Sequence, residues 1–288
     1  MVRRIWPVVV VLVALGVILA LVAAGVFNST SSSATTPTYS GAFGPANHSA
    51  GQVPGGPWEP VAAIAFDTPT GVTVPVGSSV GTNCTLAPVG SGPTPTTLYI
   101  PAYHGAFASG ASPWWGIVFD QRSTHQILLV QVLNGTAQAI AVGSGPCGAS
   151  FQNFTTIPSK VVDSSVAASA AWSDGGSAFA AAHSSLNLSM EMGLIGGGTF
   201  GGVPVGTVWV IQLTPCGALG SGGPSGTQPT FEALVDAETG VVSLATATTT
   251  VCGTSGSSLT TPLGTVLAMG APAPLSPSNT VIGCRASD

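Results

Sequence analysis

The chain has 288 residues, and its five basic and ten acidic side chains give a formal net charge of −5 at pH 7. Charged residues make up only 5% of the chain, against about a quarter in ordinary soluble domains. So few cations cannot neutralise a run of phosphates, which argues against nucleic acid as a partner.

An apolar run without a charge occupies residues 8–27, shortly after Arg3 and Arg4. About twenty residues at a helical rise of about 1.5 Å span the roughly 30 Å hydrocarbon layer of a bilayer. The arginines predict a cytoplasmic stub at 1–7, an anchor in contact with membrane lipid, and a single-pass cell-membrane protein with its C-terminal domain outside. The alternative is a cleaved signal peptide, because Ala23 and Gly25 are small residues at a spacing that a signal peptidase accepts. Both interpretations export the body of the chain.

Residues 28–57 are rich in Ser, Thr, Pro, Gly and Ala, with scarcely a large apolar side chain. Such a segment cannot bury enough surface to offset the entropy of ordering it. We therefore expect a stalk, whose composition also permits O-glycosylation.

Sequons are frequent in the chain. Six of its seven asparagines begin an N-x-Ser/Thr sequence, whereas the Ser and Thr content would place about one or two there by chance. The excess predicts N-glycosylation, which would hydrate a surface that carries few charges. The candidate acceptors are Asn28, Asn47, Asn83, Asn134, Asn153 and Asn187.

Five cysteines follow the apolar run, and none lies in a C-x-x-C pair or beside a histidine at metal-ligand spacing. We expect disulfides in an exported domain. The candidates are Cys84, Cys147, Cys216 and Cys252, with Cys284 left as a free or intermolecular thiol.

Two segments repeat at a shift of 105 residues: Leu129–Gly135 aligns with Leu234–Gly240, and Cys147–Gly148 aligns with Cys252–Gly253. Each predicts a hairpin preceded by a Trp-bearing apolar strand. The expected strands are 115–119, 126–133 and 136–142 in the first copy, and 208–213, 230–236 and 241–247 in the second. This pattern favours two related units, 58–150 and 151–288. The alternative is the general likeness of short hairpins to one another.

The segment Val161–Trp172 predicts a helix, with Asp163 or Ser164 as its cap. Val162, Val166 and Ala170 fall on one face, and Asp174–Gly176 ends the helix. A helix followed by three antiparallel strands predicts an α+β fold in which helices cover one face of a sheet.

The string from Phe231 to Val242, with the Trp209 strand and an Ala-rich helix before it, resembles the PepSY domain, whose closing hairpin reads D-A-x-T-G. The resemblance covers about 161–245. It implies a small exported or membrane-attached module that binds or inhibits partners such as envelope proteins or an exported peptidase. The chain differs from the family in its scarcity of charge and in the insertion at 217–228.

The duplication further suggests the pairings Cys216–Cys252 and Cys84–Cys147, although four cysteines alone allow three connectivities.

The turn motif Asp236, Thr239 and Gly240 is expected to be structural: the aspartate accepts turn amides and the glycine takes a positive φ. Calcium held by Asp236, Glu238 and Thr239 is the alternative. Trp114 and Trp115 are expected in the core, with a binding platform as the alternative.

The remaining candidate patterns for catalysis, metal binding and phosphate binding are incomplete. Asp120, Ser123 and His125 lack a nucleophile elbow, and the four histidines show no metal-ligand spacing. The glycine-rich loop 196–202 lacks the Lys-Ser/Thr of a phosphate loop, which favours a flexible connection into the strand that begins at Val208. The sequence therefore predicts no catalytic residue, metal or cofactor. It favours an exported protein that acts in binding or display, with a PepSY-like inhibitor or chaperone of an exported peptidase as the alternative.

Overall fold

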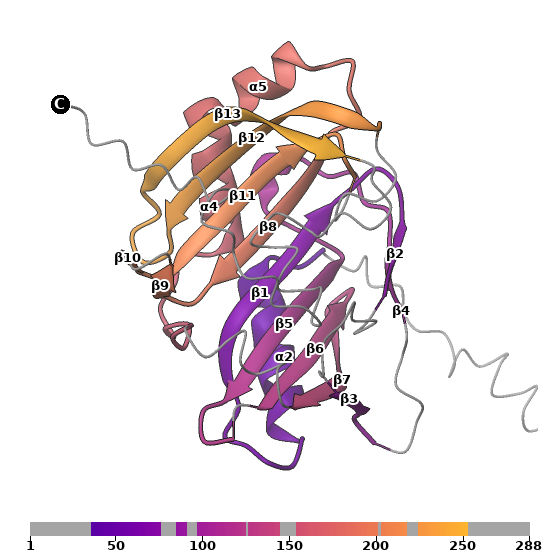
Figure 1. Ribbon diagram of the computed structural model, residues 1–288, viewed down its shortest axis with the longest axis vertical. Helices are drawn as coiled ribbons and strands as arrows, with labels where there is room; N and C mark the ends of the chain where they lie inside the picture. The colour runs from indigo at the N-terminus through magenta and orange to yellow at the C-terminus, as the bar shows by residue number, and fades with distance from the viewer. Residues whose placement is uncertain are drawn as a thin grey trace, which may run out of the picture. The chain divides into compact units, whose positions relative to one another are not determined.

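The computed structural model describes residues 36–75, 85–90, 97–124, 126–144, 154–200, 203–217 and 224–252 (Figure 1). The predicted stub, the anchor at 8–27 and the first part of the expected stalk lie outside these residues. Among the helices in the described ranges, none combines the length and the apolar character needed to cross a bilayer.

A nine-stranded antiparallel sheet forms the body of the fold, in the order β13-β12-β11-β8-β1-β5-β6-β7-β3. Its strands are β1 Glu59–Asp67, β3 Thr85–Pro88, β5 Trp114–Gln121, β6 Gln126–Leu133, β7 Thr136–Ser144, β8 Ser189–Ile195, β11 Val208–Thr214, β12 Gly226–Asp236 and β13 Val242–Cys252. Two small sheets pair β2 Val72–Pro75 with β4 Thr97–Ile100 and β9 Gly198–Phe200 with β10 Val203–Val205. The predicted α+β class is confirmed as a large antiparallel sheet with few helices.

Each half of the sheet is an antiparallel meander that follows a helical segment in the chain. Helix α2, Tyr39–Gly51, precedes β1, β5, β6 and β7. The second helical segment precedes β8, β11, β12 and β13, and consists of α4 Ser164–Ala171, the π-helical turn η3 Trp172–Gly176 and α5 Ser177–Ala182. β1 and β8, the first strands of the two meanders, pair antiparallel and join the halves. The predicted units 58–150 and 151–288 therefore share one continuous sheet.

Matching hydrogen bonds recur in the two halves. The indole of Trp115 on β5 donates to the carbonyl of Pro37, and the indole of Trp209 on β11 donates to the carbonyl of Val162, both at 3.0 Å. Each acceptor lies two residues before the helix of its own half. Each indole therefore ties the residues just before a helix to the second strand of the same meander, β5 in the first half and β11 in the second.

The two helix entries also bind each other. The amide of Tyr39 donates to Oγ of Ser164 at 2.9 Å, and the amide of Ser40 donates to Oδ1 of Asp163 at 2.9 Å. Asp163 stands at the N-cap of α4, and its Oδ2 accepts a hydrogen bond from the hydroxyl of Ser165 in that helix at 3.2 Å. Burial acts to raise the pKa of Asp163, and hydrogen bonds from Thr38, Ser40 and Ser164 outweigh it, so the pKa lies below its usual range.

The stalk expected at 28–57 is wrong for residues 39–51, because they form helix α2 and belong to the folded body. Residues 28–35 lie outside the described residues. Tyr39, Ala42, Ala46 and Ala50 are buried along one side of this helix. Small side chains at a spacing of four residues allow a helix to lie close to a sheet, although each adds little hydrophobicity to the sequence. The composition resembled that of a linker because the packing relies on small residues.

The helix predicted at 161–172 begins at Ser164, and its buried face differs from the predicted one. The buried residues are Ser164, Ala167, Ala168 and Ala171, whereas Val166 is 49% exposed. Asp174 and Gly175 leave the helical region of backbone space, but the chain resumes as α5. Asp174 and Gly175 therefore kink the helical segment at the point where we expected it to end.

Both faces of the sheet are apolar and covered over much of their area. The face toward the helices holds a core in which Tyr39 lies between Trp115 and Trp209, with ring centroids 5.8 and 5.5 Å away. The opposite face holds Phe66 and Trp114 beneath residues of β2 and β4. Strands such as β1 are buried on both sides and read as continuous apolar runs.

The glycine-rich loop at 196–202, expected as a flexible connection, contains β9 and leads into β10. A Cβ at Gly196 would overlap the carbonyl oxygen of Thr155. This close backbone approach explains the glycine at that position.

Candidate functional site

The tryptophan pair does not form a binding platform. Trp114 and Trp115 are fully buried, and as neighbours on one strand they face opposite sides of the sheet. The structure corrects the binding alternative and places each ring in a different core cluster.

The turn motif has the geometry expected of a structural aspartate. Oδ1 of Asp236 accepts hydrogen bonds from the amides of Glu238 and Thr239 at 3.0 and 2.7 Å, and from the Thr239 hydroxyl at 2.8 Å. The hydrogen bonds from Thr239, with a smaller one from Glu238, hold the pKa of Asp236 below its usual range. Gly240 has a φ of 75°. The carboxylate thus closes the hairpin between β12 and β13.

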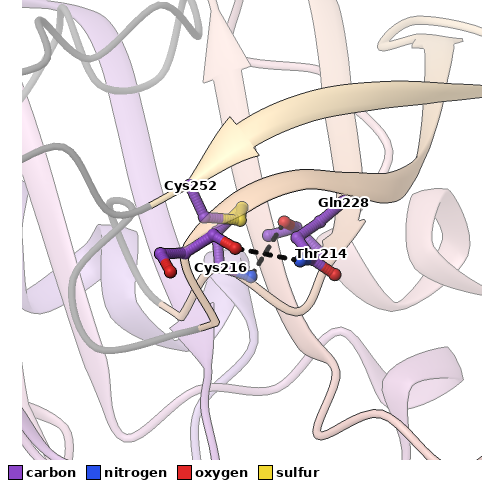
Figure 2. The surroundings of a disulfide bond; sticks show 5 residues. Thr214, Cys216, Gln228 and Cys252 are labelled. Atoms are coloured by element: carbon purple, nitrogen blue, oxygen red, sulfur yellow. Dashed lines mark hydrogen bonds between the residues drawn. A yellow bond between two sulfur atoms is a disulfide. The ribbon is translucent and has the colours of Figure 1, made fainter.

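Cys216 and Cys252 form a disulfide with a Cα–Cα distance of 5.2 Å, as predicted (Figure 2). Cys216 follows β11 and Cys252 ends β13, so the bond ties the last strand of the sheet to its next-but-one neighbour. The amide of Cys216 donates to the Thr214 hydroxyl at 3.1 Å. Cys84, Cys147 and Cys284 lie outside the described residues.

Three sequons fall in the described ranges, and their asparagines are exposed. Asn47 lies on α2, Asn134 lies at the tip of the β6–β7 hairpin with a φ of 49°, and Asn187 precedes β8. Folding leaves these asparagine side chains open to solvent. Asn28, Asn83 and Asn153 lie outside the described residues.

An ion-pair cluster that the sequence did not suggest lies at the start of β1 and the end of β5. Nη1 of Arg122 lies 3.1 Å from Oδ2 of the buried Asp120 and donates to the Phe154 carbonyl at 2.7 Å. Nε of Arg122 lies 3.4 Å from Glu59, and Nη2 donates to Thr156 at 3.3 Å. The Thr156 hydrogen bond and Arg122 hold the pKa of Glu59 below its usual range against a smaller desolvation effect. These bonds hold residues 154–156 against the sheet, so we assign the cluster a structural role.

Asp67, at the end of β1, is a second group that the sequence did not single out. Its side chain is fully buried, and Oδ2 accepts the Gly105 amide at 3.1 Å, while Oδ1 has no hydrogen-bond partner among the described residues. Burial raises the pKa of Asp67 to about 7, against the smaller opposing effect of the Gly105 hydrogen bond. Neither the burial of Asp67 nor its raised pKa can be predicted from the sequence, because both depend on which residues cover the carboxyl group in the fold.

A row of polar side chains crosses the face of the sheet that lies away from the helices. Glu191 on β8 pairs in register with Gln212 on β11, Gln212 pairs with Glu232 on β12, and Glu232 pairs with Thr246 on β13. Glu191 and Gln212 are 2% and 7% exposed, Glu232 is half-buried, and Thr246 is exposed. Burial raises the pKa of Glu232. The row offers carboxyl, amide and hydroxyl groups that become more accessible toward β13.

β13 is the most accessible of the four strands that this half contributes to the large sheet. It pairs with β12 on one side, and within the described ranges no strand pairs with its other side (Figure 1). Ser243, Thr246, Thr248, Thr249 and Val251 are exposed. We define the candidate binding surface as Glu232 and Thr246 with the outer edge of β13. Its hydroxyl groups, and a backbone edge that no described strand covers, suit it to hydrogen-bonded contact with another chain.

Within the described residues, no group of three or more His, Cys, Asp and Glu side chains is placed to hold a metal ion. Comparison of the chain with protein-family models, curated proteins and solved structures finds no significant match.

Proposed function

We propose that the chain is a membrane-anchored, exported cell-surface protein whose disulfide-stabilised, N-glycosylated ectodomain acts in binding or display rather than in catalysis. The Cys216–Cys252 bond carries the proposal, because disulfides form and persist in oxidising compartments outside the cytoplasm. The apolar run at 8–27 behind its two arginines supplies the anchor and the orientation.

The ectodomain would consist of two related PepSY-like units. Support comes from the helix and four-strand meander in each half, and from the paired indole bonds of Trp115 and Trp209 to the helix entries. The Asp236 turn has the bonds that a D-A-x-T-G hairpin requires. A binding role is supported by the candidate binding surface, which is accessible along a strand edge.

Protease treatment of intact cells that produce the full chain tests export. We expect digestion of the ectodomain without lysis, a protected N-terminal fragment in the membrane pellet, and a glycosidase-sensitive mass at Asn134 and Asn187. Non-reduced peptide mapping of the same sample should link Cys216 to Cys252. A chain that resists protease until the cells are lysed, with both thiols reduced, would contradict the proposal.

An inhibitor or chaperone of an exported peptidase is the second candidate, and the Asp236 hairpin favours it because this motif carries the family resemblance. We expect the full chain at about 1–10 μM, a range typical of moderate affinity, to slow a co-exported peptidase. The variant Asp236→Ala, which loses three turn hydrogen bonds, should inhibit less than Glu238→Ala at the same turn. Unchanged rates across the co-exported peptidases would eliminate this candidate and leave the export proposal intact.

A further inference from the structure

Among the strands that the structure describes, β13 lies at the end of the large sheet and pairs on one side only. It is 11 residues long and contains no proline and no charged residue. Proteins commonly protect an edge strand with lysine, proline, a bulge or shortness, because unpaired amides and carbonyls recruit other strands. The register irregularity of β13 lies opposite Leu234 and Val235, next to the hairpin, so the ladder from Leu244 to Cys252 is regular.

The opposite end of the same sheet is protected in the usual ways. β3, the last strand there, has four residues and ends at Pro88. The two edges of the sheet thus differ in length and in the presence of proline. Of the two end strands that the structure describes, only β13 is both long and without proline.

Both ends of β13 are held in place. The Asp236 turn fixes its first residues, and the disulfide from Cys252 to Cys216 fixes its last. Between them, most side chains of β13 are exposed and contribute little burial of their own. A strand held at both ends is pre-organised, which lowers the entropy cost of adding a partner strand.

We infer that β13 pairs antiparallel with β13 of a second copy of this chain, joining two nine-stranded sheets into one. An identical strand is the suitable occupant because β13 carries no charge, so the pair meets no like-charge repulsion. Its repeated threonines and alanines place β-branched and small side chains opposite one another, which favours cross-strand contact. Two-fold symmetry makes such an interface closed, so association stops at a dimer. The inference rests on the binding role in the proposed function, since it names the occupant of the β13 edge, but it does not require the PepSY resemblance. A monomeric chain would overturn it and leave the export proposal intact.

Introducing a charged side chain near the middle of β13 tests whether two copies of this strand pair. Thr248 is exposed, near the middle of β13, and its partner on β12 is Thr230. We expect the full chain in detergent to be dimeric at about 10 μM by sedimentation, and Thr248→Lys and Thr248→Glu each to weaken dimerisation by about tenfold or more through like charges across the strands. Mixing differently tagged Lys and Glu variants should restore a dimer. His48→Lys, which adds the same charge on an exposed part of α2, should stay dimeric.

Hydrogen exchange on the unmodified chain gives a second measurement that needs no variant. Amides of β13 should become more protected as the chain is concentrated, while amides of β6, inside the sheet, stay unchanged. A wild-type chain that is monomeric at about 10 μM would overturn the inference. So would a dimer that both Thr248 variants leave intact, or β13 protection that is independent of concentration.

Discussion

Asp67 shows how one buried carboxyl group ties stability to pH. Burial raises the pKa of Asp67 from its ordinary value of 3.8 to about 7 in the folded chain. Between these values the folded chain keeps a proton that the unfolded chain has lost. Stability therefore falls as pH rises through this window, by up to about 1.4 kcal/mol per pH unit, and levels off above it.

The substitution Asp67→Asn removes this ionisation and keeps an acceptor for the Gly105 amide. We expect the variant to gain stability relative to wild type as the pH rises from 5 to about 7.5, measured by denaturant unfolding of the full chain. Glu238→Gln, in an exposed turn, should keep the wild-type slope. Parallel stability curves for Asp67→Asn and wild type would contradict the assignment.

At the scale of elements, the sequence predicted the hairpins well because their signals are local. β6 runs from Gln126 to Leu133 as expected, its turn is Asn134–Gly135, and the Asp236 turn bonds as its motif predicts. Alternation, turn chemistry and a Trp in the preceding strand are all visible in a short window.

The elements that the sequence missed depend on their surroundings. β1 lies at the centre of the sheet with both faces covered, so it lacks the alternation of a half-exposed strand. Helix α2 buries alanines against the sheet and contains Pro45, which gives it the composition of a linker. The accessible edge of β13 was equally hidden, because only the order of strands shows which one is last.

At the scale of the whole molecule, the two meanders form one cooperative body. β1 and β8 pair in register, the helix entries bind each other through Tyr39 and Ser164, and one core cluster runs from Leu128 to Phe231. A packed sheet with a shared core has no surface along which its halves can separate without exposing apolar area. A substitution that destabilises one end of the sheet should therefore lower the stability of both halves.

The disulfide at the β13 end is the sharpest probe of this coupling. The double variant Cys216→Ala/Cys252→Ala removes a bond that closes a sequence separation of 36 residues. It should lower the free energy of unfolding by about 2–4 kcal/mol, because the unfolded chain regains the conformations that the loop excluded. Hydrogen exchange should show the same loss of protection in β5 and β6 as in β11 and β12, while Ser225→Ala, an exposed residue before β12, should change neither half. If β5 and β6 kept wild-type protection while β11 and β12 lost theirs, the two halves would unfold separately and the shared core would not couple them.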